Sequence, residues 1–120
     1  MTSRTSAYWI VTAIVVGEWS VGGTMDLLRM APFYPTMIDL GYPSYLATIL
    51  GTAKVVAAAV LLAPRLPRLK EWAYAGVVIN MTGAAASNAA VHRPGGMIAP
   101  AVFCLLTLAS WATRPADRRL

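Results

Sequence analysis

Charged residues are scarce in this sequence. Asp, Glu, Lys and Arg make up 12% of its 120 residues, against about 25% in ordinary soluble domains. Hydrophobic residues make up 58%. A chain of this length has much surface for little interior, so it cannot remove that much apolar surface from water by folding alone. The composition therefore predicts one domain, spanning residues 1–120, that lies in a lipid bilayer.

Cysteine and histidine are almost absent. The single cysteine, Cys104, excludes an internal disulfide and a CxxC motif. One cysteine and one distant histidine also argue against a zinc site. No phosphate-binding loop, dinucleotide fingerprint or Ser–His–Asp arrangement is recognisable. We therefore expect no metal, no cofactor and, because the net charge of +5 is spread over links and ends, no nucleic-acid partner.

Long apolar runs dominate what remains. A helix that crosses a bilayer needs about 20 mostly apolar residues. Backbone polar groups in lipid must be bonded within each segment, so the runs are expected to be helices. The prediction is an all-α, four-transmembrane-helix bundle whose spans cover residues 8–28, 44–63, 70–90 and 97–113.

The link between the first two spans is rich in proline. Pro32, Pro35 and Pro43 exclude a long helix there, and apolar residues between them predict a short interfacial segment, either a helix or a re-entrant cap. The N-terminal run contains Glu18 and Asp26 and lacks a clean cleavage site, so we expect no cleavable signal peptide.

Basic residues are distributed unevenly over the links and ends. With four spans, one side carries seven Lys or Arg residues and the other carries two, Arg29 and Arg93. This asymmetry predicts a multi-pass protein of the cell membrane with both termini in the cytoplasm. The seven residues are Arg4, Arg65, Arg68, Lys70, Arg114, Arg118 and Arg119.

Polar side chains inside the predicted spans lie at two depths. Glu18, Lys54 and Asn80 lie about 15 Å from the ends of their spans. Asp26 and Asn88 lie about 12 Å nearer the outer face. A charge at the bilayer centre costs about 2.5–3.5 kcal/mol, so these groups are expected to face a cavity or the bundle interior.

Helical periodicity places these groups on three stripes that can face one another. The stripes are Glu18, Gly22, Met25 and Asp26; Thr48, Gly51, Lys54 and Ala58; and Asn80, Ala84, Ser87 and Asn88. They predict a cavity between the first three spans, with the fourth span as scaffold. Further candidates for supporting roles are Trp19, Tyr45, Ser87 and His92.

Each candidate also has a structural interpretation. Lys54 can be the counter-ion of Glu18, and Asp26 can lie at the outer interface beside Arg29. The two asparagines, Asn80 and Asn88, can form hydrogen bonds that hold neighbouring helices together. His92 can be a solvated residue of a turn.

Three stretches resemble the DoxX-like family of small four-helix membrane proteins. They are Leu-Gly-Tyr-Pro at 40–43, Ile-Leu-Gly-Thr-Ala-Lys at 49–54 and the basic stretch 62–76. The family takes its name from a subunit of an archaeal thiosulfate:quinone oxidoreductase. Its members commonly have an acidic residue where Asn80 stands and a histidine where Asn88 stands, and Glu18 is unusual among them.

Two function classes follow. The first is a cofactor-independent enzyme, a hydrolase, isomerase or cyclase, that acts on a lipophilic small molecule by epoxide opening, isomerisation or cyclisation. Glu18 and Asp26 would be its catalytic acid and base. The resemblance implies the second class, a non-catalytic or quinone-linked subunit that partners an oxidoreductase. In either class the partners are the bilayer, a lipophilic molecule and possible further copies of the chain in a homo-oligomer.

Overall fold

The computed structural model describes residues 2–31 and 33–118. Pro32 and Arg119, which entered the predictions above, lie outside them. The elements are α1 (Ser3–Leu27), α2 (Phe33–Asp39), α3 (Tyr45–Leu62), α4 (Pro67–Ala90), η1 (Pro94–Met97), α5 (Ile98–Ala112) and η2 (Ala116–Arg118). No strand occurs among these described residues, and the all-α prediction is confirmed.

The helix ends have local causes. The first long helix begins at Ser3, five residues before its predicted start, because the Thr2 side chain accepts a hydrogen bond of 3.1 Å from the Thr5 amide. α4 begins at Pro67, and proline suits the first helical turn, where a missing N–H costs nothing. The short α2 occupies the link between α1 and α3, as predicted.

Three helical segments are long and apolar enough to cross a membrane within the described part of the chain. They are Ser3–Leu27, Tyr45–Leu62 and Pro94–Ala112. α4 has 24 residues but carries Lys70 and Glu71 near its start and two asparagines further on. The fold is therefore a helical membrane bundle, and the fourth span along α4 stays a prediction.

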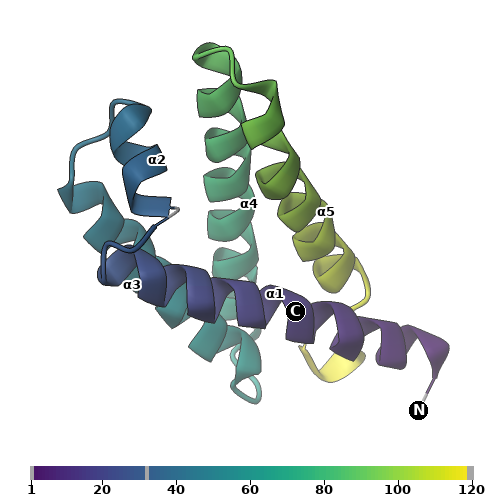
Figure 1. The fold of residues 1–120 in the computed structure, drawn as a ribbon. Helices are drawn as coiled ribbons and strands as arrows, with labels where there is room; N and C mark the ends of the chain where they lie inside the picture. Colours follow the sequence, from purple (N-terminus) through teal and green to yellow (C-terminus); the bar gives the residue numbers. More distant parts are fainter. Residues whose placement is uncertain (1, 32, 119–120) are drawn as a thin grey trace.

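The long helices form one bundle. α1 crosses in front of α3 in Figure 1, while α4 and α5 run side by side in opposite directions. The core lies where α1, α3 and α4 meet, with Val15, Leu61, Val77 and Met81 around Trp19. The Trp19 ring meets the Tyr74 ring edge-on, with centroids 6.4 Å apart.

Hydroxyl groups tie α5 to its neighbours. The buried Ser110 bonds Thr12 of α1 at 2.6 Å and Tyr74 of α4 at 2.8 Å. Thr107 instead donates to the carbonyl of Phe103, 2.7 Å away and one turn back in its own helix. Ser110 therefore joins three helices, whereas Thr107 is satisfied within α5.

Both chain ends lie with the α3–α4 link at one end of the bundle. Arg4 donates to the carbonyl of Ala112 at 3.1 Å, and Arg118 donates to the carbonyl of Leu61 at 2.8 Å. The buried Lys70 donates to carbonyls just after α3. Cations are favourable at a helix C-terminus. The basic residues that the sequence assigns to one side of the membrane thus gather at one end of the fold, and the location of this end in the cytoplasm stays a prediction.

Candidate functional site

The site is built on a close approach of α1 and α3. A Cβ added to Gly23 would lie 2.9 Å from the carbonyl oxygen of Gly51, so the two backbones touch there. Gly22 is less constrained, because a Cβ there would meet only the flexible side-chain ends of Glu18 and Lys54. Small residues allow such close helix packing in membranes. The contact brings Lys54, one turn beyond Gly51, beside the C-terminal half of α1.

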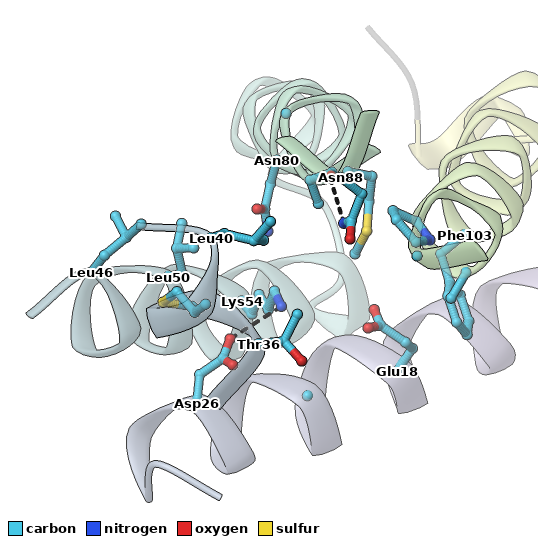
Figure 2. Close-up of a pocket in the computed structure, with 18 of the residues that line it drawn as sticks. Glu18, Asp26, Thr36, Leu40, Leu46, Leu50, Lys54, Asn80, Asn88 and Phe103 are labelled. Atoms are coloured by element: carbon cyan, nitrogen blue, oxygen red, sulfur yellow. Dashed lines mark hydrogen bonds and ion pairs between the residues drawn. The ribbon is translucent and has the colours of Figure 1, made fainter. Parts of the chain in front are cut away.

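Lys54 pairs with Asp26. Its Nζ lies 3.1 Å from Oδ2 of Asp26, and the carboxyl is 1% exposed. The sequence offers Glu18 as the counter-ion; the structure gives the bonded pair to Asp26 and keeps Glu18 within electrostatic reach of Lys54. Asp26 also stands in the last turn of α1, three residues before Arg29, so its location at the outer interface stays a prediction beside this buried pair. Figure 2 shows the dashed contact between the two helices.

Glu18 lies about two turns before Asp26 on α1. A Cβ added to Gly22 would lie 3.2 Å from Oε1 of Glu18 and 3.9 Å from Nζ of Lys54. Both side chains therefore face one point, and Glu18 interacts electrostatically with Lys54 and Asp26. Its Oε2 is buried, and no described residue gives it a hydrogen bond. The structure thus leaves this carboxyl with a charged neighbour but no bonded partner for that oxygen.

A cavity of about 790 Å³ opens beside these groups. This volume falls within the range of roughly 300–1,000 Å³ that is usual for small-molecule sites. Its polar lining includes Glu18, Asp26, Lys54, Asn80 and Asn88, as Figure 2 shows. Most of the other lining is apolar, including Met25, Leu40, Leu50, Ile79, Met81 and Phe103. The five principal polar predictions therefore converge on one largely apolar cavity.

The two asparagines have different surroundings. Asn88 is 6% exposed, and its Nδ2 donates to the carbonyl of Ala84 at 2.9 Å. A Cβ on Gly96 would overlap the Asn88 amide, so η1 closes tightly over it. Asn80 extends from α4 into the cavity in Figure 2. Asn88 is thus a packing group at one end of the cavity, while Asn80 faces its interior.

Four predicted supporting residues lie outside this cavity lining. Trp19 belongs to the core, because its position in α1 turns it toward α4. Tyr45 is 63% exposed at the start of α3. His92 is exposed, has a φ of 59° and lines a separate shallow hollow. Ser87 bonds the hydroxyl of Tyr42, which does line the cavity.

Some lining residues were missed at the sequence level. Thr36, Met37 and Leu40 reach the cavity from α2 and its end, and Tyr42 follows them. The apolar character of the segment is visible in the sequence, but its folding back over the cavity is not. α5 also contributes Ala99, Pro100 and Phe103. The last span is predicted to be mainly scaffold; α5 packs against α1 and α4 and also supplies this apolar part of the cavity wall.

The arrangement of helices and the motifs along them lead to a known group of proteins. Residues 10–110 match the model of the DoxX-like family. This chain belongs to the DoxX-like family. No curated protein and no solved structure gave a significant match.

Family membership agrees with the fold. The DoxX-like match extends from α1 to α5, and it contains all the cavity-lining residues, from Glu18 to Phe103. The candidate site therefore belongs to the DoxX-like domain. Together with three membrane-length apolar helices, the match identifies a small membrane protein.

Proposed function

We propose that this DoxX-like protein is an intramembrane enzyme that performs acid–base chemistry on a lipophilic small molecule. One observation carries the proposal: Glu18 places a carboxyl group with a buried, unbonded oxygen at the wall of a largely apolar cavity. Burying an ionisable group without full hydrogen bonding is costly, and such groups in membrane proteins are usually functional. Packing alone does not account for it.

The chemistry that fits is proton transfer without a cofactor. The Glu18 carboxyl would give its proton to an epoxide oxygen or to an alkene carbon of the substrate. In an isomerisation it would take a proton back from a neighbouring carbon. In an epoxide opening, water or an internal hydroxyl would form a bond to the ring carbon as the C–O bond breaks, and the proton that this nucleophile loses would return to the Glu18 carboxylate. The reaction class is epoxide opening, double-bond isomerisation or cyclisation.

The ion pair would support this step. Lys54 lies between two carboxyls, bonded to Asp26 and within electrostatic reach of Glu18. A cation so placed stabilises negative charge on Glu18 when its proton leaves. Asp26 would hold Lys54 in place and be available as the second acid–base group of the site, because it lines the same cavity.

The first experiment asks whether the cavity binds a lipophilic molecule. Organic extracts of purified protein are analysed by mass spectrometry for wild type, Ala84→Phe and Ala86→Phe. Ala84 lines the cavity, whereas Ala86 is exposed on the same helix and serves as the matched control. We expect one apolar metabolite in the wild type and Ala86→Phe samples and its loss from Ala84→Phe. A stoichiometric quinone would instead favour the quinone-linked subunit.

The second experiment tests the chemistry. Turnover of lipophilic epoxides, such as limonene oxide and styrene oxide, and of any extracted metabolite is measured with Glu18→Gln at equal folded protein. Removing a general acid typically lowers the rate by about 10²–10⁴. Asp39→Asn is the control, because Asp39 is exposed on α2 and outside the cavity lining. Wild-type rates in Glu18→Gln would refute the acid–base mechanism.

A further inference from the structure

The polar groups around the cavity differ in whether the fold already satisfies them. Asn88 is bonded to the carbonyl of Ala84, and Tyr42 to Ser87. Asp26 is bonded to Lys54 through Oδ2 only, and its Oδ1, like Oε2 of Glu18, is buried without a partner among the described residues. The Asn80 amide likewise makes no side-chain hydrogen bond among the described residues, and unlike those two oxygens it is not fully buried. Asn80 is half-buried at the cavity wall on α4. Its donors and acceptor therefore remain for whatever occupies the cavity.

The chemistry of an amide restricts what this occupant can be. Asparagine offers two N–H donors and a carbonyl acceptor, and it cannot titrate. In an apolar surrounding, a polar group without a partner costs free energy, and a ligand that supplies the partner recovers it. The neighbouring walls, formed by Leu50, Ile79 and Met81, offer only apolar contact. The fitting ligand is apolar over most of its surface and carries an oxygen acceptor opposite Asn80.

We infer that Asn80 is the specificity-determining residue of the site, and that it selects lipophilic molecules bearing an epoxide, ether or carbonyl oxygen over hydrocarbons of the same shape. The inference rests on the proposed function, because it names the substrate class of the same cavity. It separates the asparagines by role: Asn80 binds the ligand oxygen, and Asn88 packs η1 against α4. Glu18, on the facing helix α1, would then act on the group that Asn80 orients.

The test uses a pair of probes that differ by one oxygen, caryophyllene oxide and caryophyllene. Their binding to the full chain in lipid nanodiscs is measured by equilibrium partition. A hydrogen bond contributes about 0.5–1.5 kcal/mol net, so wild type should bind the oxide roughly threefold to tenfold more tightly. In Asn80→Leu this preference should fall to about one, while binding of the hydrocarbon is kept.

Two further variants make the result specific. Asn80→Gln retains the amide and should retain part of the preference for the oxide. This variant also keeps the test possible if Asn80→Leu does not fold. Thr82→Val, an exposed position on the same helix outside the cavity lining, should behave as wild type. Equal binding of the two probes by wild type, no binding of either, or an unchanged preference in Asn80→Leu would overturn the inference.

The outcome is distinguishable from that of the proposed function. Loss of turnover in Glu18→Gln with an unchanged preference in Asn80→Leu would leave the acid–base enzyme standing and remove the role of Asn80. A preference that depends on Asn80, in a protein that turns over none of the epoxides, would leave an oxygen-selective binding site and remove the enzyme.

Discussion

Gly23 and Gly51 meet backbone to backbone where α1 crosses α3. A Cβ on Gly51 would lie 2.7 Å from the carbonyl oxygen of Gly23, and one on Gly23 would lie 2.9 Å from that of Gly51. Neither distance can be relieved by rotating a side chain, because backbone atoms are involved. The pair therefore fixes the separation of the two helices and the register between Asp26 and Lys54.

Gly23→Ala should destabilise the protein. Forcing extra volume into a closed contact typically costs about 1–3 kcal/mol. Gly17→Ala, on the same helix with open space at its Cβ position, is the matched control. It should be neutral or stabilising by up to about 1 kcal/mol, since alanine favours a helix more than glycine does. Thermal unfolding in detergent measures both, and equal effects of the two substitutions would contradict the close contact.

Lys54→Met should be strongly destabilising, because it leaves the buried Asp26 carboxyl without its cation. Breaking a buried ion pair from one side costs about 3–5 kcal/mol. Adding Asp26→Asn should recover much of that loss, since the uncompensated charge is then gone. Adding Glu18→Gln to Lys54→Met should recover less. The measurement is the unfolding midpoint of each double variant. A higher midpoint with Glu18→Gln than with Asp26→Asn would make Glu18 the principal partner of Lys54.

The sequence predicts which residues share a helix face but not how the faces are aligned. Glu18, Gly22, Met25 and Asp26 all line the cavity, because 3.6-residue periodicity alone brings them together. The predicted proximity of Glu18 and Lys54 is confirmed, but the bonded partner of Lys54 is Asp26, which the matching of depths from assumed span ends did not indicate. The offset between α1 and α3 is set by the glycine contact, and α1 begins earlier than its apolar run suggests.

Contacts between residues far apart in the sequence could not be predicted either. Nothing in the periodicity of the sequence indicates that α2 folds over the cavity or that Tyr42 meets Ser87 on α4. Tyr42 occurs in the family-like motif at 40–43, but near the end of a predicted span it is equally typical of an aromatic belt. Its hydrogen bond is a tertiary feature, visible only once the bundle is assembled.

Tyr42→Phe should loosen the segment formed by α2 and the loop that follows it. Ser87 already donates its hydroxyl proton to the carbonyl of Gly83 at 2.8 Å, so the Tyr42 hydroxyl is the donor to Ser87. Loss of one such bond should speed amide hydrogen exchange in residues 34–42 about twofold to tenfold. Tyr45→Phe is the control, because Tyr45 is 63% exposed. Unchanged exchange in Tyr42→Phe would show that the bond does not hold this wall.

The last prediction concerns the membrane topology, and it depends on α4. This helix is less apolar than the other long ones, but Asn88 is buried and Asn80 faces the cavity, while Leu69 and Trp72, outside the cavity lining, are exposed at 42% and 74%. A helix with its polar residues turned into the bundle can cross a bilayer. We expect four spans, with both termini and the α3–α4 link in the cytoplasm, because basic residues concentrate there.

In a Cys104→Ala background, an impermeant maleimide applied to intact cells should label Pro94→Cys and not Pro64→Cys. Both positions are exposed and lie beyond opposite ends of α4. Labelling of both or of neither in intact cells, when both react in opened cells, would show that α4 does not cross. Labelling of Pro64→Cys alone would show that the protein is inserted the other way round.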